Sequence, residues 1–298
     1  HGCGHNLLGS AAMLAAAGLK DWLEKTGTPG RVRYYGCPAE EGGAAKGFMV
    51  RAGAFDDVDA AVTWHPAGVT KVQLANSLAN TRIDFSFTGR SSHASSAPHL
   101  GRSALDAVEL MNVGVNYMRE HMPPDARIHY AVLDAGGVAP NVVQGFAKVR
   151  YAVRARELGT MQALVERVKK VAEGAALMTE TSVKAQIVSA VSNMLDNEPM
   201  RRTMYENMQR LGGVPFDATD RKYAAEIQAT LTAEDIGSEY RKAGVEERED
   251  TPLCDFVVPF DAQGVSMPGS TDVSDVSWVV PTIEARVATH AIGTPGHS

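Results

Sequence analysis

Arg82-Ile83-Asp84-Phe85-Ser86-Phe87-Thr88 alternates polar and apolar side chains with a period of two. This pattern is typical of a strand with one buried face. The chain that follows predicts a helix over residues 101–120, strands over 128–133 and 147–155, a helix over 159–179 and a strand over 182–191. The order β-α-β-β-α-β is that of a compact, ferredoxin-like α+β unit. We therefore expect residues 78–193 to form a domain inserted into another one.

The segments on either side of this unit predict an α/β domain. Before it, an alanine-rich helix over residues 7–23 ends at the breaker Gly27-Thr28-Pro29-Gly30. The remaining predicted elements are a strand over 31–37, a short helix over 47–52, a strand over 60–64, helices over 198–211 and 224–242, and strands over 276–280 and 285–290. Alternating strands and helices favour a mostly parallel sheet covered by helices. We expect residues 1–77 and 194–298 to build this domain together.

The composition is that of an ordinary globular protein, with 44% hydrophobic and 21% charged residues among 298. The net charge of -6 argues against nucleic acid or an anionic membrane as the main partner. No apolar run is long enough to span a bilayer, and no signal peptide is present. Three cysteines are too few for a disulfide framework, which favours the cytoplasm. Because the chain lacks an initiator Met and begins inside a motif, we expect it to be an internal part of a longer protein.

Two potential metal ligands lie at the start of the chain. Cys3 and His5 are two residues apart, so both can reach one ion from a single turn. A thiolate and a neutral imidazole suit zinc or another borderline metal. Taken alone, a pair of this kind is usually incidental.

Further candidates follow two predicted strands. Glu40 and Glu41 come after the strand at 31–37, and His65 comes after the strand at 60–64. The carboxyl ends of parallel strands meet at one edge of a sheet, where sites gather. There, one carboxylate can bind a metal while its neighbour moves a proton. The alternatives are a solvated acidic loop for the glutamates and a packed polar residue for His65.

The inserted unit and the end of the chain carry weaker candidates. His93, in a loop, can be a hydrogen-bond donor to a developing oxyanion or an ordinary surface histidine. Asn141 and Arg154 can hold a carboxylate or amide, although the residues alone favour a turn former and a strand-face charge. His297 lies in a turn, where histidines are usually just exposed. The stretch at residues 270–275 can cap a helix or orient a ligand imidazole.

Together these motifs resemble a known family. Cys3-Gly4-His5, Glu40-Glu41, Trp64-His65-Pro66, the His93 loop and Pro295-Gly296-His297 are similar to motifs of the di-metal amidohydrolases and carboxypeptidases, which include aminoacylase and the carboxypeptidase G type. The closest branch is the one in which a Cys replaces a bridging Asp. The resemblance runs over essentially all 298 residues. It implies a zinc-peptidase-like catalytic domain with an inserted lid that pairs two subunits.

The resemblance also implies a role for each candidate. It makes Glu40 the general base and places His93 on the lid, from which it would reach into the partner subunit's site. Asn141 and Arg154 would hold the carboxylate end of the substrate. The metal ligands would be Cys3, His5, Glu41, His65 and His297, around two divalent ions, zinc or manganese.

The chain departs from the family pattern in two places. Asn6 stands where many members of the branch have Asp, so we expect the orientation of His5 to differ. The family also has strands and helices before the first motif and elements after the last histidine. We expect the sheet of this chain to have exposed edges where these are missing.

The expected function is metal-dependent hydrolysis of an N-acyl or N-aroyl amino acid, with p-aminobenzoyl-glutamate as the substrate that we would name first. The expected assembly is a homodimer through the lid, with a second related subunit as a further possibility. A general N-acyl-amino-acid hydrolase or a dipeptidase would use the same scaffold. A non-catalytic binding protein or an inert fragment are the alternatives of another class. A spare carboxylate at Glu40 argues against binding alone.

Overall fold

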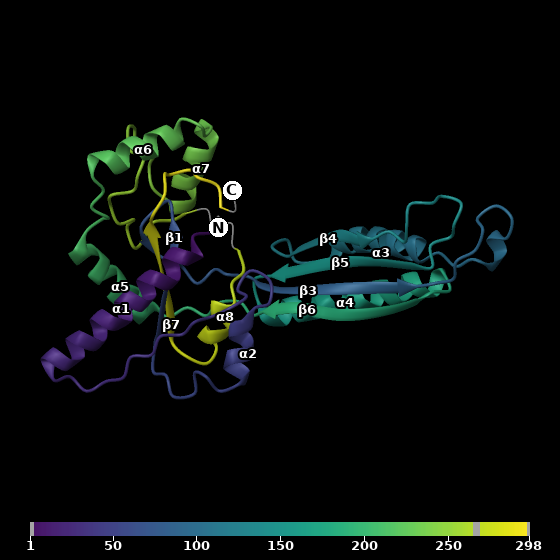
Figure 1. Ribbon diagram of the computed structural model, residues 1–298, viewed down its shortest axis with the longest axis horizontal. Coiled ribbons are helices and arrows are strands. Elements are labelled where there is room, and N and C mark those ends of the chain that lie inside the picture. Colours follow the sequence, from purple (N-terminus) through teal and green to yellow (C-terminus); the bar gives the residue numbers. More distant parts are fainter. Residues whose placement is uncertain (1–2, 265–268, 297–298) are drawn as a thin grey trace.

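The computed structural model describes residues 3–264 and 269–296 of the chain. Figure 1 shows an elongated molecule made of a rounded part and a long, narrow part. The helices and strands, in chain order, are α1 (His5–Thr26), α2 (Ala45–Arg51), β1 (Ala61–Ala67), β2 (Lys71–Val72), β3 (Ala79–Thr88), α3 (Ala104–Met118), β4 (Arg127–Asp134), β5 (Phe146–Ala155), α4 (Leu158–Met178), β6 (Ser182–Val191), α5 (Glu198–Leu211), α6 (Ala218–Gln228), α7 (Ala233–Ala243), α8 (Val273–Ser277) and β7 (Thr282–Ala288).

The narrow part, here called the lid, consists of β3 to β6 with α3 and α4. Its strands form an antiparallel sheet in the order β4-β5-β3-β6, and the two helices lie along it (Figure 1). Ile83, Phe85 and Phe87 alternate along β3 toward the helices and are at most 1% exposed. The polar residues between them point to the other face of the sheet, here called the polar face. The β-α-β-β-α-β order predicted from the sequence is confirmed.

The rounded part holds a second, smaller sheet. Strand β7 lies between β1, to which it is parallel, and the short β2, to which it is antiparallel. The indole Nε1 of Trp64 on β1 donates a hydrogen bond to the Leu8 carbonyl on α1, 3.1 Å away, and ties the helix to the sheet. The molecule is a mixed α/β protein, as expected. No helix in the described ranges has both the length and the apolar character needed to cross a bilayer.

Two predicted strands are wrong. Residues 31–37 form no strand in the described structure, and this segment is held instead by side chains such as Arg33, which pairs with Asp57 at 2.7 Å. Residues 276–280 form no strand either: Val276 lies in helix α8, and Val280 lies three residues after the end of this helix, where its amide still donates to the Val276 carbonyl; both valines pack with Phe55. Apolar residues four apart share one face of a helix, so a short apolar run does not distinguish the two structures.

The predicted helix over 224–242 is two helices. Thr232 begins α7 by accepting a hydrogen bond from the Asp235 amide, and the Asp235 carboxylate accepts one from the Thr232 amide. This reciprocal capping box starts a new helix at that residue. The chain therefore turns between α6 and α7 instead of continuing straight.

The chain enters and leaves the lid next to one segment of the rounded part, residues 269–275, and is hydrogen-bonded to it at both places. Where the chain enters the lid, the Leu78 amide donates to the Gly269 carbonyl at 2.9 Å. Where it leaves, the Ser192 amide donates to Asp275 Oδ1, also at 2.9 Å. The hinge end of the lid is thus the end at which β3 begins and β6 finishes.

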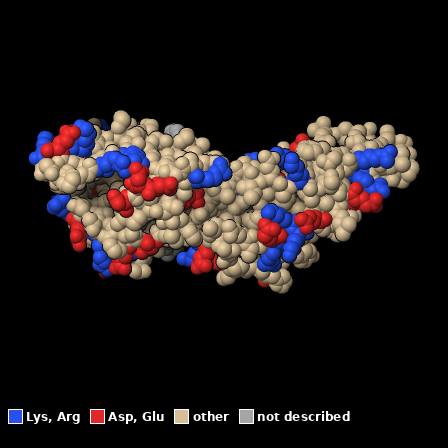
Figure 2. Space-filling view, turned by 90° about the horizontal axis from the view of Figure 1, so that it is seen from below, with Lys and Arg blue, Asp and Glu red and all other residues tan. Residues whose placement is uncertain are grey.

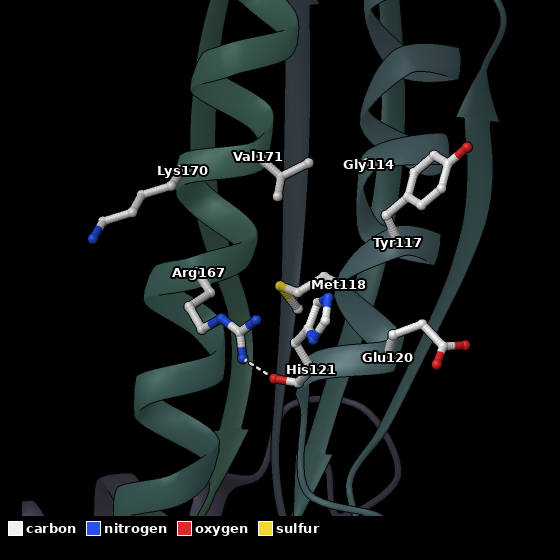
Figure 3. Close-up of a pocket in the computed structure, with 8 residues that line it drawn as sticks. All are labelled: Gly114, Tyr117, Met118, Glu120, His121, Arg167, Lys170 and Val171. Carbon is white, nitrogen blue, oxygen red and sulfur yellow. Dashed lines mark hydrogen bonds between the residues drawn. The ribbon is translucent and has the colours of Figure 1, made fainter.

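The surface carries mixed charges. In Figure 2 acidic and basic side chains are interspersed over both parts, and no continuous basic stripe crosses that face. A separate hollow of about 420 Å³ lies between α3 and α4 on the helical face of the lid (Figure 3). Its lining is largely apolar, and its Arg167 donates to the His121 carbonyl at 2.7 Å. This hollow lies across the lid sheet from the polar face.

Asp84 is the buried acid of that polar face, and its loss is expected to weaken the lid. It is 4% exposed and binds Arg150 Nε at 2.6 Å and Lys148 Nζ at 2.7 Å. The hydrogen bond from Arg150 holds the pKa of Asp84 below its usual range. Because both cations are partly solvated, we expect Asp84→Asn to lower the free energy of unfolding by about 1–2 kcal/mol at pH 7.

Urea unfolding at several pH values checks this. The carboxylate stabilises the fold fully above the pKa of an unfolded aspartate, about 3.9, and this contribution disappears as the pH falls through the lower folded value. The deficit of Asp84→Asn should therefore shrink in acid. Asp125→Asn, which removes an exposed pair with Arg156, should cost less than about 1 kcal/mol. A deficit of Asp84→Asn that is the same at every pH would contradict the assignment.

Candidate metal centre

A tight turn presents the first two candidate ligands. Gly4, between Cys3 and His5, has a left-handed backbone with φ of 70°. A Cβ at this position would lie 3.2 Å from Pro66 Cγ at the end of β1. Glycine therefore permits both the turn and the close approach of the strand. As a result, the His5 and His65 rings face each other edge to face, with centroids 5.5 Å apart.

Two overlapping groups of potential ligands meet here. Cys3, His5 and His65 form one group, and His5, Glu40 and Glu41 form the other; within each, the ligand atoms lie within 4.8 Å of one another. His5 Nε2 is 3.8 Å from Glu41 Oε1. Two ligands of one tetrahedral zinc ion lie about 3.3–3.7 Å apart, given their bond lengths. Each group of three, one with a thiol and two imidazoles and one with an imidazole and two carboxylates, thus has the donor types of a borderline divalent metal site, with ligand atoms slightly farther apart than in the bound state.

The Cys3 thiol is protonated in the absence of metal. Burial, together with the neighbouring Glu41 carboxylate, raises its pKa to about 11. A cysteine binds metal as the thiolate, so a metal ion entering this site must displace that proton.

His65 is oriented by groups around its Nδ1 atom. Nδ1 lies 2.7 Å from the Pro66 carbonyl oxygen and 3.3 Å from Arg286 Nη1. Because a carbonyl only accepts, the shorter contact assigns the proton to Nδ1 and leaves Nε2 as the ligand atom. Burial and the Arg286 charge also lower the pKa of His65, which keeps the ring neutral. Arg286 in turn lies 2.9 Å from the buried Glu284.

Glu40 is held by a residue far along the chain. Thr271 Oγ1 donates a hydrogen bond to Glu40 Oε1 at 2.9 Å. The loop that carries the glutamate pair is closed by the Gly43 and Ala44 amides, which both donate to the Ala39 carbonyl. Ala39 and Ala44 have left-handed backbones, with φ of 58° and 52°. Such strain, held by the surrounding structure, is common at functional sites and fixes the carboxylates here.

The segment at residues 270–275 connects the glutamate loop to the hinge. Asp272, which is 1% exposed, forms an ion pair with Lys46 at 2.6 Å, and its Oδ2 accepts a hydrogen bond from the Lys46 amide in the first turn of α2. Asp272 thus binds an amide in the first turn of α2 from a distant part of the chain, while its own helix α8 has no side-chain cap. At the other side, the Thr271 amide donates to Ser77 Oγ at 3.2 Å, next to the point where the chain enters the lid.

His93 and Asn141 lie together at the tip of the lid, away from these ligands. The Ala94 amide donates to the Asn141 carbonyl at 2.9 Å. The His93 loop follows β3, and the Asn141 loop connects β4 to β5 at the same end of the sheet, opposite the hinge. The ten residues of β3 span about 30 Å. His93 Nδ1 accepts hydrogen bonds from the Ser95 and Ser96 amides, so its Nε2 carries a proton and can donate. Within one chain the structure does not bring His93 or Asn141 to the candidate metal ligands.

The other two candidates differ in position. Arg154 lies on the polar face of the lid at its hinge end, directly across from Asn80 on β3. His297 lies outside the residues that the structure describes.

The chain resembles proteins of known family. Residues 77–179 match the peptidase dimerisation domain of the M20 type. Over its whole length the chain is 46% identical to one of the subunits of p-aminobenzoyl-glutamate hydrolase from Escherichia coli (strain K12), and it spans 64% of that protein. It is 31% identical to the Xaa-Arg dipeptidase of Mus musculus, over 71% of this chain and 49% of the relative.

A solved structure supports the fold. A Bacillus subtilis protein described as a dinuclear metal binding peptidase from the M20 family superposes with a TM-score of 0.56, at 18% identity, over 97% of this chain and 64% of its own. The resemblance inferred from the motifs is confirmed by these matches. The chain therefore carries a dimerisation domain of the M20 peptidase type at residues 77–179 and shares its fold with a member of that family.

Proposed function

We propose that the protein is a metal-dependent amidohydrolase that cleaves the amide bond of N-acyl or N-aroyl amino acids. The observation that carries the proposal is the placement of Glu40: Thr271 holds its carboxylate beside a cluster of thiol, imidazole and carboxylate ligands. In this assignment Cys3, His5, Glu41 and His65 hold divalent cations. The family resemblance adds His297 as a ligand, and zinc or manganese as the metal, with two ions per site.

The chain's own groups divide the chemistry. When bound, the metal ions polarise the scissile carbonyl and make the attacking water more acidic. Glu40 accepts a proton from that water and delivers it to the departing nitrogen. His93, through its Nε2 proton, stabilises the oxyanion that develops on the carbonyl oxygen. Arg154 and Asn141 hold the carboxylate end of the substrate.

The position of His93 favours a dimer. Since the tip of the lid lies about a strand length from the hinge, we assign His93 and Asn141 to the site of a second copy, joined through the lid at residues 78–193. The dimerisation-domain match at residues 77–179 supports this pairing. A second, related subunit is the alternative partner, because the 46% identical relative and a 29% identical relative are named as two different subunits of one hydrolase. We assign the protein to the cytoplasm from its low cysteine content.

The substrate proposal rests on the relatives. We propose p-aminobenzoyl-glutamate, hydrolysed to p-aminobenzoate and glutamate, after the 46% identical relative. The alternative is a dipeptidase or general N-acyl-amino-acid hydrolase, which the 31% identical Xaa-Arg dipeptidase favours.

Hydrolysis rates on a panel of substrates, together with metal analysis of the protein, test both the proposed amide hydrolysis and the proposed substrate. We expect purified protein that contains divalent metal to release p-aminobenzoate from p-aminobenzoyl-glutamate, with kcat/KM at least about 100-fold above that for acetylated neutral amino acids or dipeptides. Chelation should abolish turnover, and zinc or manganese should restore it. Preference for dipeptides would select the alternative substrate class. Metal-loaded protein that cleaves none of these amides would contradict the proposed function.

A further inference from the structure

An unusual group of side chains lies at the hinge end of the lid's polar face. Asn80 on β3 is paired directly with Arg154 on β5, and Arg82 projects to the same face two residues further along β3. Burial and the Arg82 charge together lower the pKa of Arg154, so the two guanidinium groups are close enough to repel. An anion placed beside two neighbouring cations is stabilised by both of them.

The described part of the chain does not provide such an anion. Among the ion pairs of the described residues, none includes Arg82 or Arg154. Asp84, the buried acid of this face, is already shared by Lys148 and Arg150. On β4, Arg127 donates to the Pro124 and Ala126 carbonyls. His129, also on β4, adds no negative charge.

Two polar atoms at this place are buried without a hydrogen-bond partner. They are Arg154 Nε and Asn80 Oδ1, and Asn80 as a whole is only 6% exposed. A buried donor or acceptor without a hydrogen-bond partner commonly lowers the free energy of unfolding by about 1–3 kcal/mol. The arrangement fits a polar ligand that offers an acceptor to Arg154 Nε and a donor to Asn80 Oδ1.

This corner adjoins the glutamate loop. Arg82 Nη1 donates a hydrogen bond to the Glu41 carbonyl oxygen at 3.1 Å. The contact joins the lid face to the candidate metal centre, since Glu41 is one of its potential ligands. A molecule whose amide lies at the metal centre would therefore extend its amino-acid end toward Arg82 and Arg154.

We propose that Arg82 and Arg154 form a subsite for two carboxylates, which selects substrates whose amino-acid end is aspartate or glutamate. Asn80 Oδ1 is an acceptor, so its partner there would be an N–H of the ligand. The inference rests on the proposed function and extends it. Arg154 holds the α-carboxylate, and Arg82 uses its remaining donors for the side-chain carboxylate. Guanidinium groups suit this task because their planar donors match the two oxygens of a carboxylate.

The test compares p-aminobenzoyl-glutamate with p-aminobenzoyl-glutamine, which has the same shape but no side-chain charge. We expect Arg82→Gln to lower kcat/KM for the glutamate compound about 10- to 150-fold, the value of a hydrogen-bonded ion contact, and for the glutamine compound less than about 3-fold. Lys184→Gln is the matched control. It removes one positive charge from the same face of the sheet, at the row of Ser86, and should change neither value by more than about 3-fold.

A binding measurement makes the test independent of turnover. In metal-loaded protein carrying Glu40→Gln, titration calorimetry should give the same selective loss of affinity for the glutamate compound when Arg82→Gln is added. Equal losses for both compounds would mean that Arg82 acts only through its contact with Glu41, and would overturn the inference. No loss for either compound would also overturn it. If the wild type hydrolyses neither compound but binding is still selective, the proposed function fails and the dicarboxylate subsite stands.

Discussion

Replacing Glu40 with Gln is expected to lower kcat by about 10²–10⁴-fold while the protein keeps its metal. Glutamine preserves the size of the side chain and can still contact Thr271, whose hydroxyl lies 2.9 Å from Glu40 Oε1. It cannot accept a proton from water. The loss should therefore appear in kcat, with little change in KM, because a group that acts mainly in the transition state contributes little to substrate binding.

Glu41 provides the matched comparison, since it is the next residue and the same amino acid. Its carboxylate oxygen lies 3.8 Å from His5 Nε2, so Glu41→Gln should weaken metal binding as well as turnover. Elemental analysis of the two purified variants, with rates measured at saturating metal, separates the roles. Equal metal loss in both variants would show that Glu40 is a ligand and would remove it as the general base.

Mixing two inactive variants is expected to restore activity. If His93 serves the partner's site, a dimer of one Glu40→Gln chain and one His93→Ala chain contains one complete site. Random pairing makes half of the dimers mixed, and each has one good site of two, so the mixture should recover about a quarter of wild-type activity. Co-expression of the two chains with different tags, followed by tandem purification, isolates the mixed dimers, which should show about half of wild-type activity.

A second mixture provides the control. Glu40→Gln and His65→Ala both change the site of their own chain, so no pairing of these two variants rebuilds a complete site. This mixture should remain inactive. Recovery in neither mixture would mean that His93 has no role across the subunits, and the distance along β3 would leave it without access to any metal centre.

The lid could be predicted from the sequence because its two central strands, β3 and β5, each have one buried face. Period-two patterns identify such strands directly. The edge strand β6 of the lid and helix α5 of the rounded part also have the bounds that the sequence predicts. The strands of the rounded part are harder to predict from the sequence. Residues 31–37 have the composition of a strand, but a strand exists only where a neighbour pairs with it, and composition carries no information on that neighbour.

Some residues of the candidate site could also be predicted from the sequence, and others could not. Cys3, His5, Glu41 and His65 could be proposed because thiol, imidazole and carboxylate groups are distinctive metal ligands and stand in motifs similar to those of a known family. Thr271 could not, since it meets Glu40 across 231 residues and a threonine has no special ligand chemistry. Arg286 and Arg82 were missed for a similar reason: each is an ordinary strand residue whose importance comes from what lies on the next strand or loop.

The length of strand β3 sets the distance between the Arg82 corner and the loop that carries His93. The strand carries Arg82 near its hinge end, and the loop of His93 follows its other end. Inserting one residue would push the tip outward by about 3.3 Å and turn every following side chain to the opposite face, so that Phe85 and Phe87 would meet water. Inserting two residues would keep each side chain on its own face of the sheet but would move the tip outward by twice that distance. The number of residues in β3 therefore sets the distance between the Arg82 corner and the His93 loop, and this number cannot change without loss of one of the two sites.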